Sequence, residues 1–145
     1  MSNQLYFEDV AEGQEIPPLE KQVHMINLLM YLGTVWLTDR IHFDHLYATE
    51  HRGLPGVVAP GNMGVDYYTH LLSDWAGEKG ELRKLSTQYR SFMVAGDTLS
   101  CGGKIIGKYI KEGKGYIELE LWIKNEKGIN CAPGKGVVEL PVRGG

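Results

Sequence analysis

The sequence predicts an α+β fold in which one long apolar helix packs against a curved antiparallel sheet. Between residues 63 and 75, apolar side chains recur at the spacing of a helix, and after Gly80 the apolar period changes to two. Turns that contain glycine separate the segments of period two, which favours hairpins. No repeat or linker divides the 145 residues, so we expect a single domain over 1–145.

The chain is predicted to begin with a strand and a short helix. Pro17 and Pro18 exclude a helix locally, and residues 19–24 can form the first strand. Asn27 is suited to cap a mostly apolar helix over residues 28–36, because its side chain can accept a hydrogen bond from the first helical turn.

Two more helices are predicted before the sheet continues. Asp44 can cap the first of them, which Gly53 would end. Pro60 stands where a first helical turn tolerates proline, and Gly77 would end the helix that follows. Its apolar residues at helical spacing are Met63, Tyr67, Tyr68, Leu71, Leu72 and Trp75. This helix is the longest and most apolar, so we expect it at the centre of the fold, covered by the sheet.

The second half of the chain is predicted to form antiparallel strands. One segment carries apolar side chains at alternate positions, which indicates a half-buried strand: Ile117, Leu119, Leu121 and Ile123. Residues 99–109 and 137–142 also have the composition of strands. Turns are predicted between these segments at residues 95–97, 112–115 and 126–128.

Composition and charge narrow the classes of function. The chain is 43% hydrophobic and 23% charged, as ordinary globular proteins are. Its net charge is −3 and it has no basic block, which argues against nucleic acid as a partner. No apolar run approaches the roughly 20 residues that span a bilayer, and the first residues lack the order of a signal peptide. We therefore expect a cytoplasmic protein with no membrane partner.

The cysteines and most histidines show no ligand or disulfide pattern. Cys101 and Cys131 lack Cys-x-x-Cys spacing and are expected to be free buried thiols in a reducing compartment. Four histidines also lack the spacing of metal ligands, so we expect no metal site: His24, His45, His51 and His70.

The segment from Asp39 to Asp44 places one histidine, His42, between two carboxylates. Because the central helix begins soon afterwards, an imidazole and a helix N-terminus can come together, which suits acid–base chemistry on a carbonyl compound. Asp44 directly precedes a predicted helix and is interpreted as its N-cap. Asp39 remains open, either as a base or as a loop carboxylate paired with Arg40.

Several segments, in this order along the chain, resemble the MaoC-like dehydratases, which have the hot-dog fold. Their order and spacing cover nearly the whole sequence: residues 40–44 (RIHFD), 47–48 (YA), 53–58 (GLPGVV), 60–61 (PG), 74–77 (DWAG) and 96–99 (GDTL). The segment at 74–77 also resembles the small MaoC-like subunits of heteromeric hydratases that process steroid side-chain thioesters.

The resemblance implies a curved sheet wrapped around the long helix and two protomers side by side, as a homodimer or a heterodimer with another MaoC-like subunit. It implies an active site at the interface that takes a thioester of coenzyme A or of a carrier protein. The family reaction is the reversible hydration of a 2-enoyl thioester, usually to the (R)-3-hydroxyacyl form. No cofactor is implied beyond the coenzyme A of the substrate.

The resemblance also assigns roles to residues. In the family, an aspartate and a histidine five residues later hold one water, and His42 stands at the position of that histidine. Gly61 would offer its backbone N–H to the thioester oxygen at the positive end of the central helix. Asn62 can donate a hydrogen bond from the same turn, and Arg40 can orient a carboxylate.

The chain departs from the family at Leu37, which stands where the family has its aspartate. Leucine cannot bind or deprotonate water, and loss of one acid–base group commonly costs about 10²–10⁴ in rate. Either Asp39 takes over, or a partner subunit supplies a carboxylate, or the chain is a non-catalytic subunit that binds thioesters. A further alternative is a hot-dog thioesterase that uses Asp66 of the central helix.

Overall fold

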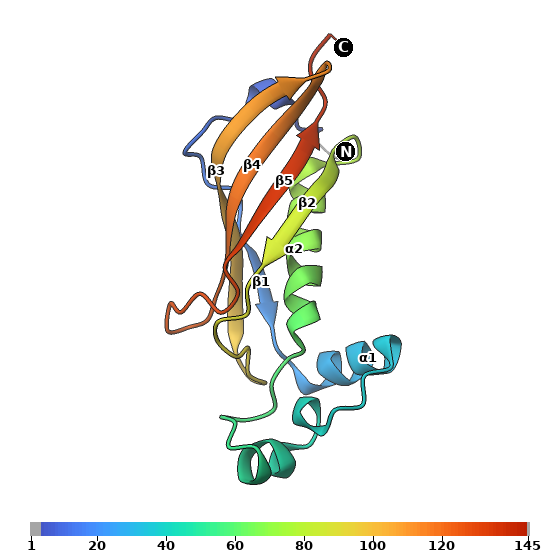
Figure 1. The fold of residues 1–145 in the computed structure, drawn as a ribbon, viewed down its shortest axis with the longest axis vertical. Helices are drawn as coiled ribbons and strands as arrows, with labels where there is room; N and C mark the ends of the chain where they lie inside the picture. The colour runs from blue at the N-terminus through green and yellow to red at the C-terminus, as the bar shows by residue number, and fades with distance from the viewer. Residues whose placement is uncertain (1–3, 145) are drawn as a thin grey trace.

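The protein is a five-stranded antiparallel sheet that curves along one long helix (Figure 1). The computed structural model describes residues 4–144. Residues 1–3, which belong to the segment tested above for a signal peptide, lie outside that range. The strands follow the spatial order β1-β3-β4-β5-β2: β1 (Leu19–Gln22), β2 (Glu81–Thr87), β3 (Thr98–Lys111), β4 (Lys114–Lys124) and β5 (Gly134–Leu140). The helical elements are η1 (Phe7–Asp9), α1 (Met25–Val35), η2 (Arg40–His42), η3 (Tyr47–His51) and α2 (Gly61–Ala76).

The central helix α2 is where the sequence predicts it. It begins directly after Pro60 and ends at Gly77, whose φ of 76° suits glycine and whose N–H donates to the carbonyl of Ser73. Its buried side faces the sheet and comprises Met63, Gly64, Tyr67, Tyr68, Leu71, Leu72 and Ala76. The predicted α+β class, with a long central helix against a curved sheet, is confirmed.

The predicted hairpin between β3 and β4 is confirmed as well. Glu112 and Gly113 both have positive φ, 53° and 77°, as the two central residues of a type I′ turn require. The strand β2 was not predicted from the sequence. A register shift between Leu82 and Lys84 breaks its alternation, so its half-buried leucines, Leu82 and Leu85, stand three residues apart instead of two.

Residues 25–58, which we call the helical lobe, connect β1 to α2 and project from one end of the sheet (Figure 1). The prediction for α1 is wrong at its start: the helix begins at Met25 after His24, and Asn27 lies inside it without capping it. The predicted second helix is present, but residues 47–51 have π-helical hydrogen bonds. It ends at Gly53, as predicted, with φ of 63°.

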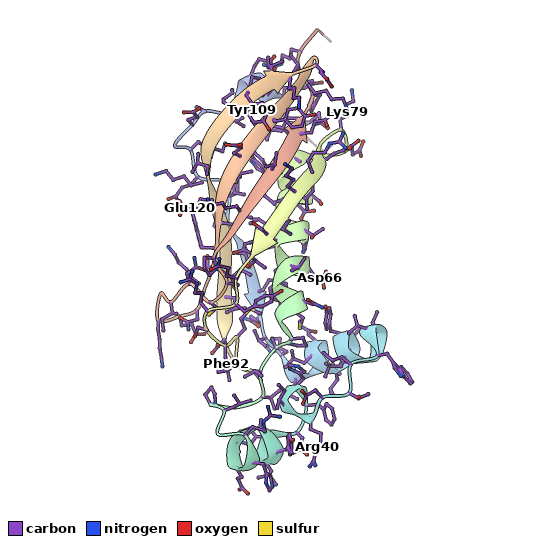
Figure 2. All side chains as sticks on the ribbon, in the orientation of Figure 1. Arg40, Asp66, Lys79, Phe92, Tyr109 and Glu120 are labelled. Carbon is purple, nitrogen blue, oxygen red and sulfur yellow. The ribbon has the colours of Figure 1, made fainter. Side chains whose placement is uncertain are left out.

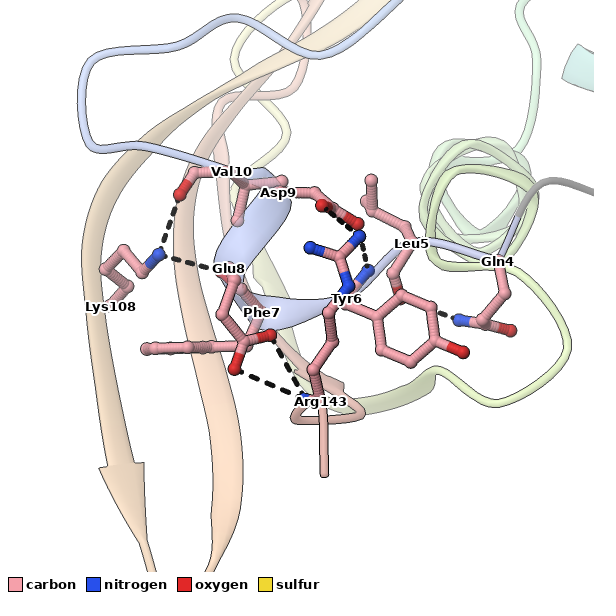
Figure 3. Close-up of polar contacts among 9 residues, drawn as sticks. All are labelled: Gln4, Leu5, Tyr6, Phe7, Glu8, Asp9, Val10, Lys108 and Arg143. Carbon is pink, nitrogen blue, oxygen red and sulfur yellow. Dashed lines mark hydrogen bonds and ion pairs between the residues drawn. The ribbon is translucent and has the colours of Figure 1, made fainter. Parts of the chain in front are cut away.

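The opposite end of the sheet is closed by the N-terminal residues (Figure 3). The ammonium of Lys108 donates to the carbonyls of Phe7 and Val10, at 2.7 Å each. The guanidinium of Arg143 pairs with Asp9 at 2.6 Å. These contacts tie residues 7–10 to Lys108 of β3 and to Arg143.

Candidate active site

His42 is anchored to the backbone that leads into the central helix. Its Nδ1 lies 2.7 Å from the carbonyl oxygen of Val58. A carbonyl can only accept a hydrogen bond, so Nδ1 carries the proton, and in the neutral ring Nε2 keeps its lone pair. The backbone N–H of Val58 donates in turn to the carbonyl of Ile41 at 3.2 Å, which fixes the two segments to each other. The imidazole is therefore oriented, with Nε2 as the basic atom.

Gly61 begins α2 three residues after Val58, so their Cα atoms are at most about 11 Å apart. The first N–H groups of a helix have no acceptor within it, and among residues 4–144 no backbone carbonyl accepts from Gly61 or Asn62. A Cβ at position 61 would lie 2.8 Å from the ring of Tyr89, so a larger residue there would require that exposed ring to move. The positive helix end and the His42 segment are thus joined by one short stretch of backbone.

Asp39 serves as the N-cap of η2. Its Oδ1 accepts from the backbone N–H of Ile41 at 3.2 Å. Among residues 4–144, no hydrogen bond joins its carboxylate to the His42 side chain. Asp39 is close to His42 along the chain, and its role as a substitute base stays a prediction.

Arg40 orients a carboxylate, that of Asp44. Its Nε and Nη2 donate to one oxygen of Asp44 at 3.1 and 2.6 Å, and its guanidinium lies 4.4 Å from the ring centre of Tyr47. The other oxygen of Asp44 accepts from the Tyr47 N–H at 3.0 Å. That hydrogen bond, then Arg40, holds the pKa of the Asp44 carboxyl below its usual value. The N-cap role predicted for Asp44 is confirmed, whereas the part of Arg40 in substrate binding stays a prediction.

Leu37 lies in an apolar groove of about 330 Å³ within the helical lobe. The groove is lined by Leu29, Leu32, Gly33, Trp36, Leu37, Thr38 and Phe43. No ionisable side chain lines it, so at the position of the family aspartate the chain offers an apolar surface next to the segment that carries His42.

Asp66 is exposed on α2, one turn and a half beyond Gly61. Partial burial and, after it, the nearby carboxylate of Asp66 raise the pKa of Tyr31 to about 12. Tyr31 belongs to α1, so this contact links the helical lobe to the central helix. Its hydroxyl stays protonated at neutral pH and can donate to the carboxylate.

Sequence reasoning missed Val58 and Tyr89. Val58 is 16 residues from His42 and acts through its carbonyl, which every residue type has. Tyr89 is 28 positions from Gly61, in the stretch after β2, and no spacing rule links them. The one sequence feature that pointed to this contact was Gly61 itself, because a glycine at the start of a helix allows another group to approach its backbone closely. Among residues 4–144, no group of three or more His, Cys, Asp or Glu side chains is placed to hold a metal ion.

No family model and no curated protein matches the sequence. Solved structures do match it. The (R)-hydratase from A. caviae involved in PHA biosynthesis superposes with a TM-score of 0.82 at 18% identity, over 92% of this chain and 99% of that one. The MaoC-like dehydratase from Rhodospirillum rubrum gives 0.82 at 16%, over 96% and 98%. A chain of the ChsH1-ChsH2 complex from Mycobacterium tuberculosis gives 0.78 at 14%, over 90% and 98%.

At such identities the likeness concerns the fold. Within residues 4–144, no helix is both long enough and apolar enough to cross a membrane. The superposition extends over nearly the full length of these neighbours. The chain therefore has the hot-dog fold, in the form found in (R)-hydratases and MaoC-like dehydratases.

Proposed function

We propose that this chain is a MaoC-like hydratase that adds water reversibly to 2-enoyl thioesters of coenzyme A or a carrier protein. The observation that carries the proposal is the contact between His42 Nδ1 and the Val58 carbonyl, because it leaves Nε2 as a base on a ring held to the backbone that leads into the central helix. The hot-dog fold and its hydratase neighbours support the same reaction class.

In the proposed reaction, Nε2 of His42 takes a proton from water as the water oxygen bonds to C3. The electrons of the C2=C3 double bond move toward the thioester carbonyl, whose oxygen becomes enolate-like. The N–H of Gly61, with Asn62 on the same turn, stabilises that oxygen. Collapse of the enolate takes a proton at C2, and the proton held on Nε2 can supply it, so the atoms balance. Asp39 or a carboxylate of a partner subunit would speed one of the two transfers.

The test is hydration of short, medium and bulky 2-enoyl-CoA substrates, followed by loss of the enoyl absorbance. His42→Ala should lower kcat/KM by about 10²–10⁴, because the base is removed. His51→Ala is the matched control, since His51 is exposed at the end of η3 and has no part in the proposed reaction. Equal activity of wild type and His42→Ala would remove His42 from the mechanism.

A second candidate function is that of a non-catalytic subunit that pairs with an active MaoC-like chain. The apolar groove at Leu37 favours it, and so does the match to a chain of the ChsH1-ChsH2 complex, an assembly of two components. Co-expression with a MaoC-like protein encoded nearby should then yield a stable complex with activity that neither chain has alone. Turnover by the isolated chain at about 1–10³ s⁻¹, the usual enzyme range, would exclude this role.

A further inference from the structure

A groove of about 630 Å³ lies on the outer face of the sheet, away from α2. Along β4, Leu119, Leu121 and Ile123 are buried beneath α2, so the alternate residues point outward; Glu120 does so in Figure 2. The groove is lined by outward residues of β4, by the end of β2 and its continuation to Arg90, and by residues 130–135.

We propose that this groove binds the phosphate-bearing nucleotide end of a coenzyme A thioester. The inference rests on the proposed function for its substrate class, because an enzyme that acts on coenzyme A thioesters has to bind the nucleotide part of coenzyme A. The argument comes from the charges of the groove, its aromatic wall and its connection to Gly61.

Three cations line the groove: Arg90, Lys124 and Lys135. Among residues 4–144, no carboxylate lies within 4.0 Å of any of them, whereas Arg40, Arg83 and Arg143 are each in an ion pair. Glu120 is the only acidic residue of the lining. Opposite charges commonly pair across strands, and Glu120 stands directly across from Lys135, which leaves Arg90 and Lys124 without an acidic counterpart in the lining. The surplus suits a ligand with several negative charges.

The geometry of the cations favours phosphate. The Nε of Arg90 donates to the side-chain oxygen of Gln88 at 3.1 Å, which holds the guanidinium in place. The ammonium of Lys124 lies 4.9 Å from the ring centre of Trp122. A fixed guanidinium can bind phosphate oxygens in a fork, and the Lys124 ammonium, held over the indole of Trp122, adds a second cation to the same groove. The indole is itself seated over β3, because a Cβ at Gly102 would come within 2.6 Å of it.

The groove and the candidate active site meet in three consecutive residues. Gln88 and Arg90 line the groove, while Tyr89 between them contacts Gly61 at the start of α2. A molecule with its thioester oxygen at Gly61 and its phosphates at Arg90 would pass around this stretch. Coenzyme A has that form, since a flexible pantetheine arm separates its thioester from a diphosphate and a 3′-phosphate. A carrier protein would instead present a large convex surface, which fits a concave groove poorly.

The test measures binding of coenzyme A and of 3′-dephospho-coenzyme A to the full chain by calorimetry at low salt. Coenzyme A should bind about tenfold more tightly, because the 3′-phosphate adds charge-assisted hydrogen bonds. Arg90→Gln combined with Lys124→Gln should weaken coenzyme A about tenfold or more and abolish the difference between the two ligands. Lys111→Gln removes the same kind of charge at the far end of β3 and should leave both affinities unchanged.

Equal binding of the two ligands by wild type, or wild-type affinity in the double variant, would overturn the groove assignment. So would a double variant whose KM rises for a carrier-protein thioester and not for the coenzyme A thioester. His42→Ala separates this inference from the proposed function, because it should bind coenzyme A as wild type does. If coenzyme A binding depends on the groove residues but no hydration is found, the groove assignment stands and the hydratase proposal fails. If hydration is found but the groove variants do not change it, the hydratase proposal stands and the groove assignment fails.

Discussion

The sheet with α2 buries its apolar side chains, whereas the helical lobe leaves many of its own exposed. Ile117, Leu119 and Ile123 of β4 are fully buried. In the lobe, Ile26, Met30 and Trp36 are 62%, 67% and 85% exposed. Both regions contain the same types of apolar side chain, so their different exposure reflects what packs against them. The sheet and α2 cover each other within one chain, while most of the outer surface of α1 has nothing against it among residues 4–144.

The difference separates stability from function. Burial of apolar area is the main driving force of folding, so the sheet and α2 should supply most of the free energy of unfolding. An exposed apolar patch marks a surface that binds something. The lobe also carries His42 and the groove at Leu37, which places the candidate chemistry on the less supported part of the molecule. We infer that a second protomer or an acyl chain completes the lobe.

The largest expected effect contrasts one leucine of α2 with one methionine of α1. Leu72→Ala removes a fully buried side chain and should lower the free energy of unfolding by about 2–5 kcal/mol. Met30→Ala, at a position that is 67% exposed, should change it by less than about 0.5 kcal/mol. Urea unfolding of the isolated chain measures both. Similar losses for the two variants would show that the lobe is as well packed as α2.

The next effect tests whether the apolar groove is a lost acid–base site. Leu37→Asp restores a carboxylate at the position of the family aspartate, five residues before His42. If His42 is the base, the hydration rate of an enoyl thioester should rise by about 10². Leu46→Asp is the control, because Leu46 is also an exposed apolar residue of the lobe and does not line the groove. An unchanged rate in Leu37→Asp would place the second proton-transfer group elsewhere.

Trp36 allows the exposed surface of the lobe to be altered with little effect on the fold. Its φ of 55° is a conformation that glycine adopts readily. Trp36→Gly should therefore keep the stability of the monomer while weakening self-association or pairing about tenfold, because exposed tryptophans are frequent anchors of interfaces. Sedimentation equilibrium measures the association.

Glu112→Gly provides the matched control for that change. Glu112 has nearly the same φ, 53°, but lies in the β3–β4 hairpin far from the lobe. It should leave association unaltered. If both variants associate like wild type, the surface around Trp36 is not the interface, and the acyl chain becomes the better candidate for covering it.

The two regions also differ in how far the sequence predicted them. Local periodicity was sufficient for α2 and β4, because each has a single apolar face that meets one neighbour. In the lobe, the start of α1 was misplaced at Asn27, since a capping side chain is only one way to begin a helix. The bulge hid β2, because a register shift cancels the alternation on which the prediction depends.

The candidate site was predicted only in part for a similar reason. The capping role of Asp44 follows from residue type and position, whereas His42 and Gly61 were assigned their roles through the family resemblance; the structure gives the contacts of all three. The partners that orient them are the Val58 carbonyl and the ring of Tyr89, which tertiary packing brings from 16 and 28 residues away. Every residue has a backbone carbonyl, so the sequence does not show which one contacts His42. The tautomer of His42 could therefore be assigned only from the structure.

The smallest expected effect is a pH dependence confined to the lobe. The hydrogen bond from Tyr47 and the Arg40 guanidinium lower the pKa of Asp44 in the folded protein. A lowered folded-state pKa stabilises the fold above the unfolded value of about 3.9, and this stabilisation is lost as pH falls through the folded-state pKa. Amide exchange at residues 47–48, measured between pH 6 and 3 and corrected for intrinsic rates, should therefore quicken relative to that at Leu72 of α2.

Asp44→Asn tests the assignment because asparagine can accept the same capping hydrogen bond but does not titrate in this range. The variant should protect residues 47–48 less than wild type at pH 6, where the ion pair with Arg40 is lost, and its protection should then vary little with pH. A pH dependence equal to that of wild type would mean that another carboxylate controls the lobe. Since Arg40 and Asp44 flank His42 in sequence, loosening of their contact should also lower the affinity for substrate before α2 unfolds.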